Sequence, residues 1–106
     1  MEIEQQLIGE IVRRIVAAVR PQRIILFGSA ATGQMTPDSD IDLLILKAAP
    51  VGPLGESVRV RQALRGLSHP FDVIVMALDW YEDSKDVVGG LAYPTSGQGR
   101  VIYDAA

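Results

Sequence analysis

The sequence predicts an α/β (α+β) fold in which a mixed β-sheet of about four strands has helices packed against it. Apolar residues recur at helical spacing near the N-terminus, and short apolar runs of strand length follow. The expected elements follow the order α-β-β-α-β-α-β, which favours a mixed sheet covered by helices. A chain of 106 residues suits one domain and is too short for two, so residues 1–106 are expected to form a single domain.

The first helix is expected from Ile3 to Val19, because its apolar residues fall on one helical face and polar residues lie opposite. Pro21 ends this helix, since proline lacks an N–H and disfavours the helical conformation of the residue before it. The run from Arg23 to Phe27 is short, apolar and bounded by Gly28. That pattern is typical of a strand covered on both faces.

A second strand is expected over residues 40–46, which are polar at the start and apolar afterwards. Turn-forming residues at 33–39 precede it. The stretch from Ala48 to Gly55 contains two prolines and two glycines, so we interpret it as a loop. A helix from about Glu56 to Leu67 follows, on a weaker apolar periodicity.

The last third of the chain predicts a strand, a helix and a short terminal strand. The third strand covers residues 71–76, which are almost entirely apolar. Asp79 is expected to cap a helix around residues 80–88. The pair Gly89-Gly90 should end that helix and make the region mobile. Residues 99–103 predict the terminal strand.

Composition and charge exclude several classes of function. Ten Lys and Arg against thirteen Asp and Glu give a net charge of −3, so direct nucleic-acid binding is not expected. The absence of cysteine excludes disulfides, thiol catalysis and Cys-ligated zinc, and one histidine cannot build a multi-histidine site. Any metal must therefore be held largely by carboxylates. The N-terminus is acidic and no apolar run is long enough for a membrane span, so we expect a soluble, cytoplasmic protein.

Asp40 and Asp42 are the first candidate site residues. They are two positions apart at the start of a strand, so both side chains project from the same face. Two carboxylates aimed at one spot repel each other unless a cation or proton intervenes, and hard oxygen ligands suit Mg²⁺. The alternative is a solvated junction between a turn and a strand, because Pro-Asp-Ser-Asp is an ordinary turn sequence.

Two further features sharpen this hypothesis. Gly28-Ser29 follows an apolar strand, where exposed backbone N–H groups attract phosphate, although a glycine that simply ends the strand is the alternative. Asp72 is the one charged residue in the third strand, where charge is costly without a purpose. If this strand pairs beside the one with Asp40 and Asp42, the three carboxylates can converge. Otherwise Asp72 is an exposed position at a strand end.

Taken together, these residues resemble the minimal nucleotidyltransferase (MNT) family of the DNA polymerase beta superfamily. The likeness rests on Leu26-Phe27-Gly28-Ser29, on Pro37-Asp38-Ser39-Asp40-Ile41-Asp42-Leu43-Leu44, and on Phe71-Asp72-Val73. It continues through the terminal residues 99–103 and so covers essentially the whole chain. The resemblance implies the polymerase-beta-like nucleotidyltransferase fold.

The resemblance also implies an activity and a partner. The reaction would be a two-metal transfer of a nucleoside monophosphate, usually AMP from ATP, onto a hydroxyl, with pyrophosphate leaving. Gly28 and Ser29 would bind the triphosphate, Asp40 and Asp42 would hold two Mg²⁺ ions, and Asp72 would ligate one ion and help to activate the acceptor. Family members commonly act as antitoxins beside a HEPN ribonuclease toxin, which implies a tyrosine hydroxyl of such a toxin as acceptor. Self-association is left open.

Departures from the family pattern support a second hypothesis. Many members carry arginines where this chain has Ala30 and Thr32, so two cations that could contact phosphate are absent. The alternative is a non-catalytic antitoxin that neutralises its partner by binding, with a vestigial nucleotide site. Transfer to a small molecule is a third reading, disfavoured because such enzymes generally carry an additional substrate domain.

Other conspicuous residues are expected to be structural. His69, beside a proline in a turn, is interpreted as a surface residue. Trp80 and Tyr81 are interpreted as core packing of a helix onto the sheet, with a partner-binding spot as the alternative. The acidic residues of the same segment are interpreted as a solvated helix face; they are Asp79, Glu82, Asp83 and Asp86.

Overall fold

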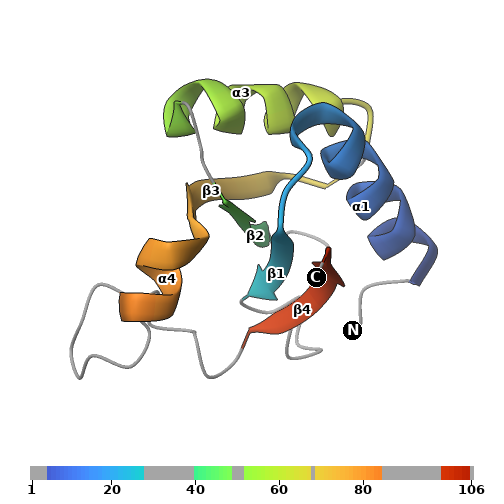
Figure 1. Cartoon of the computed structure of the whole chain (residues 1–106). Coiled ribbons are helices and arrows are strands. Elements are labelled where there is room, and N and C mark those ends of the chain that lie inside the picture. Colours follow the sequence, from blue (N-terminus) through green and yellow to red (C-terminus); the bar gives the residue numbers. More distant parts are fainter. Residues whose placement is uncertain (1–4, 28–39, 49–51, 68, 85–98, 106) are drawn as a thin grey trace.

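The computed structural model describes residues 5–27, 40–48, 52–67, 69–84 and 99–105. It confirms the mixed sheet with packed helices and the predicted order of elements. α1 and α3 lie together on one side of the sheet, and α4 lies apart from them at the lower left of Figure 1. The elements are α1 (Gln5–Val19), β1 (Arg23–Phe27), β2 (Ile41–Lys47), α3 (Pro53–Ala63), β3 (Phe71–Ala77), α4 (Leu78–Ser84) and β4 (Arg100–Asp104).

The four strands lie in the order β3-β2-β1-β4. β1 pairs antiparallel with β2 and with β4, with a register irregularity between Ile24 and Ile25 on the β4 side. β2 pairs parallel with β3, so the sheet is mixed. β2 therefore has a strand on each side, while β3 and β4 form the two edges of the sheet.

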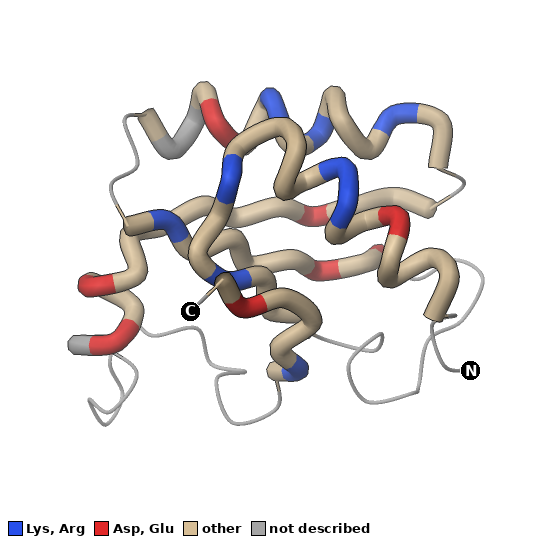
Figure 2. Tube along the Cα trace, turned by 45° about the vertical axis from the view of Figure 1, so that its right-hand side comes forward, with Lys and Arg blue, Asp and Glu red and all other residues tan. Residues whose placement is uncertain are grey.

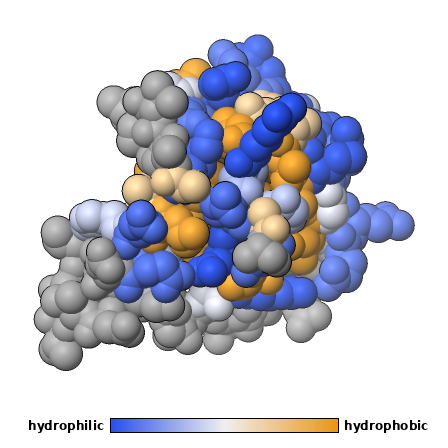
Figure 3. Space-filling view, viewed as in Figure 1, coloured by the Kyte–Doolittle hydropathy of each residue, from blue (hydrophilic) through white to orange (hydrophobic). Residues whose placement is uncertain are grey.

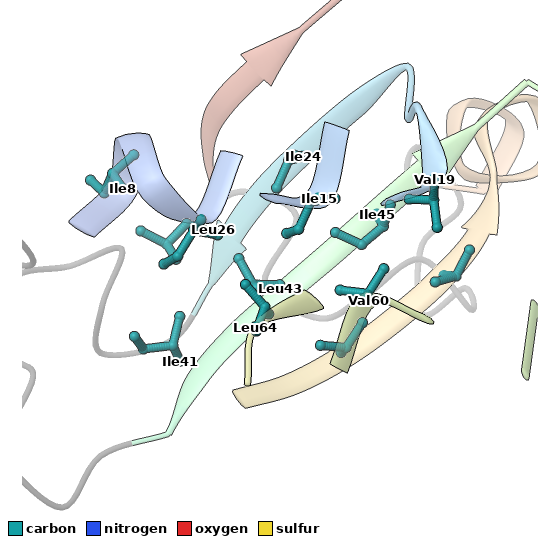
Figure 4. Packing of buried hydrophobic residues seen from close by; sticks show 13 residues of the cluster. Ile8, Ile15, Val19, Ile24, Leu26, Ile41, Leu43, Ile45, Val60 and Leu64 are labelled. Carbon is teal, nitrogen blue, oxygen red and sulfur yellow. The ribbon is translucent and has the colours of Figure 1, made fainter. Parts of the chain in front are cut away.

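The main core fills the space between the sheet and the helices α1 and α3. Side chains from both layers point toward one another there (Figure 4). The periodicity predicted for α1 is confirmed, since its buried residues recur every three or four positions. The buried members of this cluster are Ile8, Ile11, Ile15, Val19, Ile24, Leu26, Ile41, Leu43, Ile45, Val60, Leu64, Val73 and Val75.

A second, smaller cluster covers part of the opposite face. Tyr81 of α4 packs there with alternate residues of the two central strands, which explains why those strands are apolar on both faces. Trp80, its neighbour, is 42% exposed, so core packing is confirmed for Tyr81 and not for Trp80. Figure 3 shows apolar surface bordered by hydrophilic residues on the side seen in Figure 1. The buried residues of the smaller cluster are Ile25, Phe27, Leu44, Leu46 and Tyr81.

Both later helices begin earlier than predicted. α3 starts at Pro53, inside the stretch predicted as a loop, because proline fits the first helical position, where its missing N–H has no helical acceptor. It ends at Ala63 instead of continuing to Leu67. α4 starts at Leu78 directly after β3, so Asp79 lies in its first turn and is not its cap. The predicted end of this helix and the pair Gly89-Gly90 lie outside the described residues.

Ion pairs connect elements that are distant in sequence. Arg23 of β1 pairs with Glu82 of α4 at 2.8 Å and with Asp104 of β4 at 3.5 Å. Glu82 is therefore more than part of a solvated helix face. Lys47 at the end of β2 pairs with Glu56 of α3, whose side chain is almost fully buried. No helix of the described residues is long and apolar enough to cross a membrane.

Within the helical layer, Arg14 connects α1 to the end of α3. Its guanidinium donates hydrogen bonds to the carbonyl oxygens of Ala63 at 3.2 Å and Arg65 at 2.9 Å. Arg14 and Arg13 also donate to Glu10 and lower the pKa of that carboxyl to about 2. The hydrogen bond to Ala63 satisfies a carbonyl of the last turn of α3, which a helix end leaves without a helical partner.

Gly99, just before β4, lies directly against the buried ring of Phe27. A Cβ atom at this position would come within 2.5 Å of Phe27 Cε1 and 2.7 Å of Ile25 Cγ2. Both neighbours are buried and have little room to move. The close approach of the chain therefore requires glycine here.

We expect Gly99→Ala to destabilise the protein by about 1–3 kcal/mol, the usual cost of overpacking a core. Urea denaturation monitored by circular dichroism measures the change. Gly9→Ala is the matched control, because a Cβ on this exposed helical glycine meets nothing within 4 Å. The control should stabilise by about 0.5–1 kcal/mol. Equal effects of the two substitutions would contradict the packing argument.

Candidate active site

Asp42 and Asp72 are brought together by the parallel pairing of β2 and β3. The register places Asp42 directly opposite Asp72, and neighbouring strands lie about 4.8 Å apart. Both residues alternate with core residues that face α1 and α3, so their side chains belong to the opposite face of the sheet. The sequence-based condition for convergence, that the two strands be neighbours, is confirmed. Figure 2 shows acidic positions on two neighbouring strands, below helices that carry several basic positions.

Asp40 lies one residue before β2 and is exposed. The backbone N–H of Ile41 donates to the carbonyl of Pro70 at 2.9 Å, which fixes the start of β2 beside the start of β3. In extended chain, residues two apart project to the same side. Asp40 is therefore held at the same end of the sheet as Asp42 and Asp72.

Asp42 lies close enough to Asp72 and Asp40 to be affected by their negative charges. The pKa of Asp42 is raised, first by burial and then by the negative charges of Asp72 and Asp40. Asp42 is the most buried of the three, whereas Asp40 and Asp72 are exposed. An ionised Asp42 is thus unfavourable in the metal-free protein, and a cation at this spot would relieve the repulsion.

The donor set fits Mg²⁺ in its chemistry, because Mg²⁺ is bound through carboxylate oxygens together with water and substrate phosphates. Among the described residues, no three His, Asp or Glu side chains form a group that could hold an ion by themselves. Asp40, Asp42 and Asp72 remain predicted metal ligands.

The predicted triphosphate-binding residues Gly28 and Ser29 lie outside the described residues. The residue before them, Phe27, ends β1 and is the register partner of Asp42. The chain thus enters the Gly28-Ser29 segment from the strand next to Asp42. The position of Phe27 follows from the antiparallel pairing of β1 and β2, and the role of Gly28 and Ser29 stays a prediction.

Sequence reasoning missed Arg61. This residue of α3 places its Nη2 atom 3.8 Å from Oδ1 of Asp72, and its Nη1 donates to the carbonyl of Phe71 at 3.4 Å. No spacing rule links the two residues, because the contact depends on how α3 packs on β3. His69, predicted to lie on the surface, is half-buried, and its Nδ1 has no hydrogen-bond partner among the described residues.

We expect Asp42→Asn to raise the melting temperature of the metal-free protein at neutral pH, because it removes a desolvated charge repelled by two neighbours. The raised pKa means that the unfolded state releases this proton more readily, so ionisation costs folding free energy at pH values above the folded pKa. The advantage of Asp42→Asn should shrink as the pH falls through that pKa. Thermal melts in EDTA across pH 4–8 measure the difference in melting temperature between the variant and the wild-type protein.

Asp79→Asn is the control, since Asp79 is exposed in the first turn of α4, away from the three carboxylates. This control should not raise the melting temperature in a pH-dependent way. A melting temperature of Asp42→Asn that stays at or below the wild-type value at neutral pH would contradict the repulsion.

The sequence matches a known protein family. The family model described as "Nucleotidyltransferase domain" matches residues 7–84, more than half of the chain, and confirms the nucleotidyltransferase resemblance seen in the sequence. No match to a curated protein was found.

Solved structures share the fold. A chain in the crystal structure of a toxin–antitoxin with AMP-PNP is similar with a TM-score of 0.67 and 19% identity, over 92% of this chain and 73% of that one. A chain in the structure of a tri-AMPylated Shewanella oneidensis HEPN toxin in complex with an MNT antitoxin is similar with a TM-score of 0.59 and 21% identity. That match covers 95% of this chain and 73% of the other. The solved structures share the fold, and the family match shows that the chain belongs to the nucleotidyltransferase domain family.

Proposed function

We propose that this protein is an Mg²⁺-dependent nucleotidyltransferase that transfers AMP from ATP to a hydroxyl of a protein partner, and that it acts as an antitoxin. The partner would be a HEPN toxin and the acceptor a tyrosine. The observation that carries the proposal is the register pairing of Asp42 with Asp72, with Asp40 two residues ahead. Support for the partner comes from the AMPylated HEPN toxin in one structural neighbour.

Each residue would have a distinct role. Asp40 and Asp42 would hold Mg²⁺, and Asp72 would ligate one ion and face the acceptor hydroxyl. Gly28 and Ser29 would bind the triphosphate through backbone N–H groups, as glycine-containing turns do. Bound Mg²⁺ would neutralise charge on the phosphates and on the leaving pyrophosphate.

The reaction needs positioning and charge neutralisation more than covalent chemistry from the protein. The acceptor oxygen forms a bond to the α-phosphorus while the bond from that phosphorus to the bridging oxygen breaks, and pyrophosphate leaves. The acceptor proton passes to a base at the site, for which Asp72 is the candidate. Because Asp72 lies on the edge strand β3 and is 53% exposed, a protein acceptor can approach it from outside the sheet.

The test is label transfer from α-³²P-ATP to the protein encoded beside this gene, in the presence of Mg²⁺. We expect Asp42→Asn and Asp72→Asn each to reduce transfer by at least about 100-fold, the scale of losing transition-state charge stabilisation. EDTA should abolish transfer. Asp79→Asn should retain wild-type transfer, since Asp79 lies on α4 and outside the site. Absence of label under conditions where the two proteins bind would refute the proposal.

A binding-only antitoxin is the second candidate. One observation favours it: the chain has Ala30 and Thr32 where many members of the family carry arginines that could contact phosphate. Co-expression of the toxin with the double mutant Asp40→Ala/Asp42→Ala separates the two candidates, with protection against the toxin as the measured result. A catalytic antitoxin loses its protective effect in this variant while still binding the toxin, whereas a pure binder keeps it.

A further inference from the structure

Arg61 is the cation nearest to the three carboxylates in the described structure. α3 packs on the face of the sheet that carries the main core, while Asp72 projects from the opposite face. The Arg61 side chain therefore passes around the free edge of β3 to reach Asp72, with 3.8 Å between Nη2 and Oδ1.

The edge of the sheet explains why an arginine fits there. The carbonyl of Pro70 accepts from Ile41 of β2, so by the alternation of backbone groups the carbonyl of Phe71 points to the free edge. Arg61 Nη1 donates to that carbonyl at 3.4 Å. One guanidinium thus covers an unpaired backbone group and places its second nitrogen beside Asp72.

The negative charge around Asp72 gives its contact with Arg61 a role beyond covering the edge of β3. Asp42 already experiences the negative charges of Asp72 and Asp40. Among the ion pairs of the described residues, the one that includes any of these three carboxylates is the pair with Arg61. Arg61 and Asp72 are each about half-exposed, so both side chains can rearrange.

We propose that Arg61 is a positioning residue that occupies the outer side of Asp72 in the metal-free protein and gives way when a divalent cation binds. This rests on the proposed function, because it takes Asp72 to be a metal ligand. Arg61 holds the carboxylate at the sheet edge before loading and lowers the affinity of the site for metal. A cation at Asp72 and a guanidinium on the same oxygen atoms compete for one negative charge.

Mn²⁺ binding, followed by electron paramagnetic resonance of free Mn²⁺ at fixed physiological ionic strength, tests the competition. Arg61→Gln should tighten binding about threefold, the size expected for an exposed ion pair. Arg61→Lys should stay near the wild-type affinity, because it keeps a positive charge at the same place. Arg59→Gln is the matched control. It removes the same charge from an exposed position two residues earlier in α3 and should leave Mn²⁺ affinity unchanged.

A second measurement follows the arginine itself. The Nε–Hε resonance of Arg61, assigned by its loss in Arg61→Gln, should shift when Mg²⁺ is added to the wild-type protein. It should not shift in Asp72→Asn protein. A purely structural role for Arg61 would overturn the inference. Arg61→Gln would then lower the melting temperature without changing the Mn²⁺ affinity, and Mg²⁺ would not shift the Arg61 resonance of the wild-type protein.

The outcomes for the two proposals are distinguishable. Mn²⁺ bound equally well by wild-type and Arg61→Gln protein, with AMP transfer intact, overturns the role of Arg61 alone. No Mn²⁺ bound by the wild-type protein, with or without nucleotide, overturns both the competition and the metal-dependent function. Weaker binding by Arg61→Gln also contradicts the competition, because it would mean that the arginine assists the metal.

Discussion

The register between β2 and β3 is the constraint on which the rest of the structure depends. It places Ile41, Leu43 and Ile45 under α1 and α3 and, by the same alternation, turns Asp42 to the other face beside Asp72. A slip of one residue would bury the carboxylate in the main core, where an unpaired charge is very unfavourable. The packing that stabilises the fold therefore also brings the acidic residues together.

Much of this could be predicted from the sequence because strongly apolar segments leave few choices. The bounds of β1 were predicted correctly, and those of β2 and β3 to within one residue, since each is a short apolar run between turn residues. The start of α3 was predicted wrongly because Gly52 and Pro53 are turn formers in most contexts but here begin a helix. The strand order had no local signal, since it depends on contacts between segments far apart in the chain.

In the candidate site, too, some residues could be predicted from the sequence and others depend on how distant segments pack. The spacing of Asp40 and Asp42 fixes their relation locally, and the choice of Asp72 followed from the cost of a charge in an apolar strand. Arg61 was not predictable, because its distance from Asp72 depends on the packing of α3 over an edge strand. Gly28 and Ser29 stay predictions from the family pattern, supported by the position of Phe27 beside Asp42. Trp80 and Tyr81 look equivalent in sequence, and only the direction of α4 separates them.

The two faces of the sheet carry different kinds of residue. The larger cluster lies beneath α1 and α3, whereas the three acidic residues are held at the opposite face, away from that cluster. Substitutions among the carboxylates therefore leave the main core intact, and a lineage could change or lose its chemistry while the domain still folds. Such an architecture allows a catalytic protein and a purely binding one to share one scaffold and to differ by a few substitutions outside the main core.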